Sequence, residues 1–205
     1  GRALVSTPDP LPPRLRGEGR GHRVDLLVGV CAILISAVSL FIAERSNHTQ
    51  ERMLAASVWP FLSWDTSNYN DQMQREEVSL DLANDGVGPA RIETVEIAYK
   101  GRPLEDATAL LNACCIPPAQ PPRHVTKRVS TVNPLVLPAH DSVTFVALVK
   151  SPGQEDVWDN FNRERFNLTA RVCYCSVLDE CWLLKTGVAE PEKVKRCVAE
   201  GPQYH

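Results

Sequence analysis

Seven cysteines are the residues of this chain whose chemistry is easiest to specify. Cys31 lies in an apolar stretch near the start of the chain, and the other six follow it at Cys114, Cys115, Cys173, Cys175, Cys181 and Cys197. An even number of cysteines in an oxidising compartment favours structural disulfides. Six cysteines allow fifteen pairings, and sequence alone does not choose among them.

The spacing of three cysteines narrows these pairings. Cys173 and Cys175 are two residues apart in an alternating segment, so a strand places them on the same face. Cys181 enters the next strand after a predicted turn at residues 177–180. Either Cys173 or Cys175 is therefore expected to face Cys181 across a hairpin.

The remaining cysteines are expected to fasten peripheral segments. Cys197 would tie the C-terminal tail to the domain. The vicinal residues Cys114 and Cys115 follow a predicted helix over Leu104–Ala113, and one of them would pin that helix.

A metal or redox site is the alternative use of these thiols. Cys173, Cys175 and Cys181, with a vicinal pair elsewhere, could offer several soft sulfur ligands to copper or zinc. The characteristic Cys-x-x-Cys spacing is missing, and no histidine lies near these cysteines in sequence. Structural disulfides are the reading we adopt, with no metal or other cofactor.

No motif in the chain commits it to a reaction. His140, Asp141 and Ser142 are adjacent, whereas members of a catalytic triad meet in space rather than in sequence, so this segment is predicted to be a turn. Nucleophile elbows, P-loops and dinucleotide fingerprints are absent. The sequence therefore predicts a protein that is not an enzyme.

An uncharged stretch at Leu26–Ala43 is a candidate membrane anchor for the rest of the chain. Residues 24–43 contain twelve Val, Leu, Ile and Phe residues, which favour membrane insertion by roughly 4 to 7 kcal/mol. A signal peptide has a shorter apolar region, and the one tolerable cleavage site, at residues 37–39, lies inside the run. A buried helix of a soluble protein is the other alternative. We expect a single transmembrane helix.

Charge predicts how the chain is oriented. Arg14, Arg16, Arg20 and Arg23 precede the apolar stretch, so the positive-inside rule places the N-terminus in the cytoplasm and exports the rest. From residue 44 onward, 17 Lys and Arg stand against 22 Asp and Glu, which argues against binding to nucleic acid. The expected location is the inner (plasma) membrane, with the C-terminal domain in the periplasm.

Composition and periodicity divide the chain into five parts. We predict a disordered cytoplasmic arm at residues 1–23, a transmembrane helix at 24–43, a helical stalk at 44–56, a β-domain at 57–187 and a tail at 188–205 tied by Cys197. The chain begins with Gly1 rather than Met, so a few residues are expected upstream of it.

The domain is predicted to consist mainly of half-buried strands, because apolar and polar residues alternate. The strands are expected at Val58–Trp64, Val78–Ala83, Val95–Tyr99, Val125–Val132, Ser142–Val149, Phe166–Tyr174 and Trp182–Thr186. Ile92 is out of phase with Val95, which predicts a bulge near Glu93 and Thr94. One convincing short helix, Leu104–Ala113, and a weaker helical turn at Gln154–Asn162 complete the prediction.

These elements favour an all-β, immunoglobulin-like β-sandwich with one short helix. Trp59 and Phe61 share one face of the first predicted strand, which places them with Trp64 and Tyr69 in the core. An aromatic belt at the membrane surface is the alternative for these four residues.

Three segments carry a resemblance to known proteins. Residues 57–60 (SVWP), 82–90 (LANDGVGPA) and 172–182 (VCYCSVLDECW) resemble a group of single-pass bacterial membrane proteins with a cysteine-containing periplasmic β-domain. The match covers residues 54–184. It implies a topology and a bacterial envelope setting, and it implies no activity.

The sequence thus predicts a membrane-anchored periplasmic module that binds or scaffolds another envelope protein without catalysis. The alternative is a periplasmic thiol-redox or soft-metal-binding protein that uses Cys173, Cys175 and Cys181.

Overall fold

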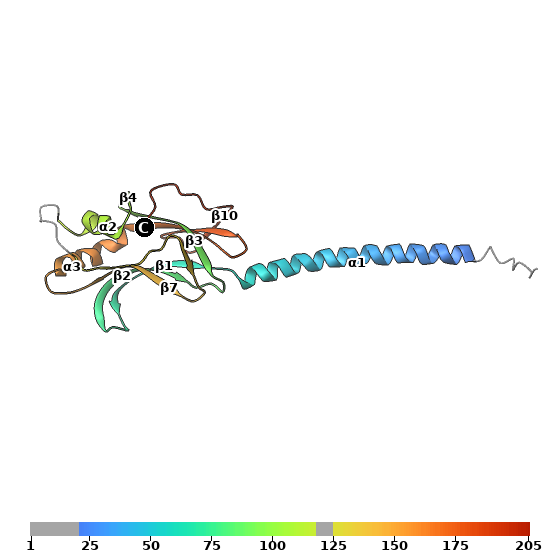
Figure 1. Ribbon diagram of the computed structural model, residues 1–205, viewed down its shortest axis with the longest axis horizontal. Coiled ribbons are helices and arrows are strands. Elements are labelled where there is room, and N and C mark those ends of the chain that lie inside the picture. The colour runs from blue at the N-terminus through green and yellow to red at the C-terminus, as the bar shows by residue number, and fades with distance from the viewer. Residues whose placement is uncertain (1–20, 118–124) are drawn as a thin grey trace, which may run out of the picture. The chain divides into compact units, whose positions relative to one another are not determined.

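The structure, a computed structural model, describes residues 21–117 and 125–205 of the chain (Figure 1). The predicted cytoplasmic arm lies almost wholly outside the described residues, as does most of the proline-rich connection after Cys115. The chain divides into two compact units, Gly1–Glu51 and Arg52–His205.

A single long helix, α1, covers Gly21–Ser57. Its apolar side chains, from Val24 to Ile42, are exposed in the chain alone. Ser36 donates a hydrogen bond of 2.8 Å to the carbonyl of Ala32, which satisfies the hydroxyl within the apolar stretch. Among the described residues, α1 is the one helix long and apolar enough to cross a membrane. A signal sequence near the N-terminus has the same length and apolar composition.

Two antiparallel sheets form the second unit (Figure 1). The four-stranded sheet has the order β1-β2-β7-β5, with bounds Leu62–Asn70, Arg75–Asn84, Ser142–Val149 and Arg128–Val129. The six-stranded sheet has the order β10-β9-β8-β3-β4, with bounds Glu192–Val194, Cys181–Lys185, Leu168–Cys175, Ala90–Tyr99 and Arg102–Leu104, and β6 (Leu135–Leu137) also pairs with β3. The prediction of a mostly β domain is confirmed.

The core forms where the alternating strands of both sheets turn their apolar faces inward. Val78, Leu80 and Leu82 of β2 are buried, and so are Val172 and Tyr174 of β8. The register between β3 and β8 shifts between Ile92 and Thr94. This confirms the predicted bulge, which lets both Ile92 and Val95 point into the core.

The described residues of the β-domain include two α-helices, so the prediction of one short helix is wrong. α2 covers Ala107–Cys114, where a helix was expected, and Asp106 caps it by accepting from the Ala109 N–H at 2.7 Å. α3 covers Glu155–Glu164, where only a weak turn was expected. It packs on the core through Val157, Trp158 and Phe161.

Several predicted strand boundaries are also wrong: β1, β2 and β3 are longer than predicted, and three other differences have a clear cause. The first strand begins at Leu62 rather than Val58, because Val58 bonds back to Ala55 of α1, and Trp59 and Phe61 bond to a turn instead of a neighbouring strand. The predicted strand at Val125–Val132 is reduced to Arg128–Val129. Phe166 lies in a short 3₁₀ helix, η1 (Arg165–Asn167), with its side chain 71% exposed. Its alternation with the residues of β8 is therefore coincidental.

The C-terminal tail packs against the six-stranded sheet and bonds to one of its strands. It crosses the outer face of that sheet, where the backbone N–H groups of Glu200 and Gly201 donate to Glu96 at 2.6 and 3.2 Å. The tail then joins the edge of β3, since the Tyr204 N–H donates to the Val95 carbonyl at 2.8 Å. The Tyr204 ring is fully buried and packs edge-on against Phe145.

Candidate functional site

The segment that leads into β1 is held by several backbone hydrogen bonds. The turn at residues 84–89, which is rich in Asn, Asp and Gly, wraps around the segment that follows α1. The N–H groups of Val87 and Gly88 donate to the Trp59 carbonyl at 3.0 and 3.1 Å, and the Asp85 N–H donates to the Phe61 carbonyl at 2.8 Å. We call this arrangement of residues 84–89 around residues 58–61 the collar.

A buried amide, Asn84, organises the collar. Its Oδ1 accepts from the Phe61 N–H at 3.2 Å and from the Gly86 N–H at 3.1 Å. Its Nδ2 donates to the carbonyls of Gly88, Leu137 and Pro138 at 2.9, 3.1 and 3.0 Å. Asn84 is only 1% exposed, so one side chain satisfies backbone groups of three separate segments.

The collar also requires two glycines. A Cβ added at Gly88 would overlap the backbone of Val58, and one added at Gly86 would overlap the backbone at Phe61. These close approaches between two backbones explain the glycines in the turn without appeal to φ.

Tyr174 of β8, in the six-stranded sheet, binds the first residue of β1 next to the collar. Its hydroxyl accepts from the Leu62 N–H at 3.3 Å. Burial raises the pKa of Tyr174 to about 12, and the hydrogen bond from Leu62 opposes that rise. Residues 57–60, 82–90 and 172–182 therefore meet at this end of the domain.

An aromatic pocket of about 160 Å³ lies beside the collar, lined by Trp59, Phe61, Tyr174, Trp182, Glu190 and Pro191. Trp59 and Phe61 form an edge-to-face pair with centroids 5.5 Å apart, and Tyr174 stacks with Trp182 at 5.9 Å. The expectation that Trp59 fills the core with Phe61 from one strand face is wrong. Trp59 is 44% exposed, because Pro60 and the collar hold it outside the strand.

A second hollow, of about 270 Å³, continues from the aromatic pocket, and Phe61 lines both. Its walls are residues 61–64 and residues 184–189. We call it the edge groove, because β1 is the outermost strand of its sheet among the described residues.

The backbone of β1 is oriented toward this groove at alternate residues. Phe61 directs its N–H and C=O at Asn84 and Asp85 of the neighbouring strand. Because the backbone direction alternates along a strand, Leu62, Trp64 and Thr66 direct theirs at the free edge. Leu62 already binds Tyr174, so the next edge-facing position in the groove is Trp64, and Thr66 follows just beyond the residues that line it.

The structure brings four of the candidate cysteines together on the outer face of the six-stranded sheet. Cys175 is bonded to Cys181 across the β8–β9 hairpin, and Cys173 is bonded to Cys197 of the tail. The Sγ atoms of Cys175 and Cys197 are 3.8 Å apart. In this form the sulfurs are bonded to one another and are not thiolate ligands for a metal.

The expectation that Cys114 or Cys115 pins the predicted helix through a disulfide is wrong. Cys114 and Cys115 are bonded to each other rather than to another element, so neither pins the helix by a disulfide. The helix is held instead by burial of Ala107, Leu110 and Leu111. Cys31 in α1 is free.

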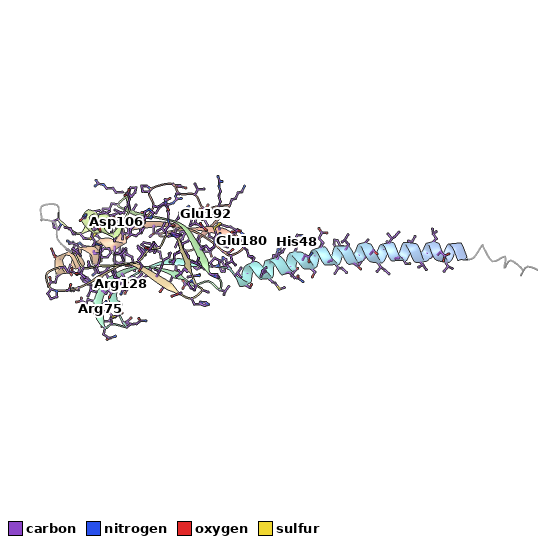
Figure 2. All side chains as sticks on the ribbon, viewed as in Figure 1. His48, Arg75, Asp106, Arg128, Glu180 and Glu192 are labelled. Atoms are coloured by element: carbon purple, nitrogen blue, oxygen red, sulfur yellow. A yellow bond between two sulfur atoms is a disulfide. The ribbon has the colours of Figure 1, made fainter. Side chains whose placement is uncertain are left out.

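Two further groups of polar residues, residues 140–142 and the ion pairs of Glu77, have structural roles. The predicted turn at residues 140–142 is confirmed only at His140, whose N–H donates to the Asn84 carbonyl at 2.9 Å, because Ser142 already begins β7. Figure 2 shows Arg75 and Arg128 near each other on the four-stranded sheet, where both bind the buried Glu77 carboxylate, at 2.6 and 2.8 Å. Glu77 is thereby fully paired within the domain.

Sequence reasoning missed the edge groove. The signal that could have found it is Pro60, which ends any strand around Trp59 and leaves that ring beside the turn at residues 84–89. Comparison of the chain with protein-family models, with curated proteins and with solved structures finds no match.

Proposed function

We propose that this protein is a membrane-anchored, periplasmic, non-catalytic module that binds an extended segment of another envelope protein. In this proposal α1 is the transmembrane anchor with its N-terminus in the cytoplasm, and the exported domain is an immunoglobulin-like sandwich. The resemblance of residues 57–60, 82–90 and 172–182 to single-pass bacterial membrane proteins supports that setting.

The observation that carries the proposal is the free edge of β1 beside the aromatic pocket. An extended segment added to a sheet edge gains main-chain hydrogen bonds, while pockets for its alternate side chains supply specificity. The edge of β1 offers both, through the backbone of Trp64 in the groove and of Thr66 beyond it, and through the neighbouring aromatic pocket, whose volume of about 160 Å³ suits one apolar side chain.

Rigidity of the collar favours binding, because a preformed edge does not have to be ordered when the partner arrives. The edge of β1 begins at Leu62, and the Leu62 N–H is held by Tyr174 while Phe61 is held by Asn84. Trp59 is the exposed anchor of the pocket, and tryptophan is enriched among residues that dominate binding energy.

Site-specific photo-crosslinking of the full chain in intact cells tests the proposal. A photoreactive amino acid at Val188, which lines the edge groove and is 53% exposed, is expected to give discrete crosslinked products. The matched control is Val136 of β6, which is 58% exposed and lies outside the groove. Trp59→Ala should remove the Val188 products while leaving the protein folded and inserted.

The crosslinked peptide of the partner is then sequenced. An extended or edge-strand segment with an apolar residue supports the proposal. Equal crosslinking at Val188 and Val136, or products that survive Trp59→Ala, would contradict it.

A further inference from the structure

The four cysteines on the outer face of the six-stranded sheet form a compact sulfur cluster. The Sγ atoms of Cys175, Cys181 and Cys197 lie within 4.8 Å of one another, and Cys173 is bonded to Cys197. We call these four residues the four-sulfur cluster. Its two disulfides are in contact, since 3.8 Å separates Cys175 Sγ from Cys197 Sγ.

Such contact has a chemical consequence. Disulfides exchange when a thiolate attacks one sulfur of a disulfide and the other sulfur departs as a thiolate. A thiolate on Cys175 would already lie against Cys197, so attack needs only a small movement of the two sulfurs. The reaction is intramolecular, because the tail that carries Cys197 is held to Glu96 through Glu200 and Gly201.

One cation lies beside Cys175. Arg91 of β3 is the cross-strand partner of Cys175, so the two side chains lie on the same face of the sheet. Arg91 is held in place, because its Nη2 binds Asp179 at 2.8 Å and Glu93 at 3.4 Å. Its charge is therefore shared with two carboxylates, and the contact between the two disulfides carries the inference.

We propose that the four-sulfur cluster is a thiol–disulfide exchange site that accepts electrons from a dithiol, such as the reduced cysteine pair of another exported protein. One thiolate of the dithiol attacks the Cys175–Cys181 bridge, and its second thiol resolves the mixed disulfide. The dithiol is oxidised to a disulfide, and Cys175 and Cys181 are reduced to thiols.

In a second step, the disulfide that holds the tail is exchanged. The Cys175 thiolate attacks Cys197, a Cys175–Cys197 bond forms, the Cys173–Cys197 bond breaks, and Cys173 leaves as a thiolate that takes up a proton. This step is an isomerisation that requires no further oxidant or reductant. The tail remains tethered in both isomers, and Cys173 and Cys181 are the thiols of the rearranged form.

Serine variants of the full chain in nanodiscs test the exchange directly. Cys173→Ser/Cys181→Ser leaves only Cys175 and Cys197 in the cluster, and digestion without reduction is expected to yield a peptide pair joined by the Cys175–Cys197 bond. Cys181→Ser alone should yield both this bond and Cys173–Cys197. The control is Cys115→Ser, whose remaining thiol at Cys114 should leave both bonds of the cluster unchanged.

A measurement on the unaltered protein keeps the test independent of folding of the variants. The chain is treated with limiting dithiothreitol, quenched with acid and mapped over time. A Cys175–Cys197 species that grows as Cys175–Cys181 declines supports the proposal. Free thiols at both Cys175 and Cys197 in the double variant, or loss of both native bridges without that species, would overturn it.

Discussion

Replacing Asn84 tests whether the collar holds the entry to the domain. Asn84→Ala removes every hydrogen bond of the buried amide and leaves the groups it served without partners. These groups are the N–H groups of Phe61 and Gly86 and the carbonyls of Gly88, Leu137 and Pro138.

The magnitude follows from the number of bonds lost. The amide has two hydrogens on Nδ2 for its three carbonyl partners, so at most four full bonds are counted, and each contributes about 1 kcal/mol net. Asn84→Ala should therefore lower the free energy of unfolding by about 4 kcal/mol. For a domain of this size that loss corresponds to a fall in Tm of roughly 8 to 16 °C.

Urea denaturation of the full chain in nanodiscs, followed by tryptophan fluorescence, measures this loss. Asp85→Asn is the matched control, because Asp85 is an exposed neighbour whose side chain binds only Ser63 Oγ, at 2.6 Å, and such surface changes usually stay within about 0.5 kcal/mol. Asn84→Asp should be at least as damaging as Asn84→Ala, since it directs a carboxylate oxygen at the carbonyls that now accept. If the losses for Asn84→Ala and Asp85→Asn agree within about 1 kcal/mol, the collar does not stabilise the domain.

Three further predictions concern other parts of the domain. Gly88→Ala should destabilise it measurably in the same urea assay, because the added Cβ overlaps the Val58 backbone. Tyr204→Ala should cost about 3 to 5 kcal/mol by emptying a core site, whereas Tyr204→Phe should be neutral or stabilising, because the buried hydroxyl has no partner among the described atoms. Hydrogen bonds from Tyr99, Lys100 and Asn167 lower the pKa of Glu164 to about 2, so Tyr99→Phe should raise it in a carbon-13 NMR titration. Since the folded-state pKa is lowered, the stabilisation from Glu164 is present above its ordinary value of 4.5 and is lost as pH falls toward 2.

Each of these has an outcome that contradicts it. Gly88→Ala with wild-type stability would mean that the two backbones can separate freely. A Tyr204→Phe variant as unstable as Tyr204→Ala would show that the hydroxyl has a partner. An unchanged Glu164 titration in Tyr99→Phe would assign the lowered pKa to the other two donors.

Periodicity predicted the parts of the fold that depend on local alternation. β7 has the predicted bounds, Ser142–Val149, although its burial does not alternate, because the four consecutive residues Phe145–Leu148 are all buried. The bulge at Ile92 was predictable because a strand must skip one residue to return an apolar side chain to the same face.

The parts that were missed depend on contacts between distant segments. The N-terminal limit of β1 is decided by backbone bonds from residues 84–89, and within residues 58–64 the one local signal for it is Pro60. The burial of Tyr204 depends on a polar tail returning to the edge of β3, where a single aromatic residue shows no period. The pairing of Cys173 with Cys197 depends on the path of that same tail.

The return of the tail has a consequence for the order of folding. The Val95 N–H binds the side chain of Gln203, 108 residues later, and the Val95 carbonyl binds Tyr204. During synthesis from the N-terminus, β3 thus keeps an unpaired edge at Val95, between its pairings with β6 and β4, and the core keeps a vacant aromatic site until residues 203–205 arrive. Late closure of this kind exposes apolar surface and strand edges to other chains. The nascent domain is therefore expected to be most vulnerable to aggregation, and to depend most on chaperones, just before its tail docks.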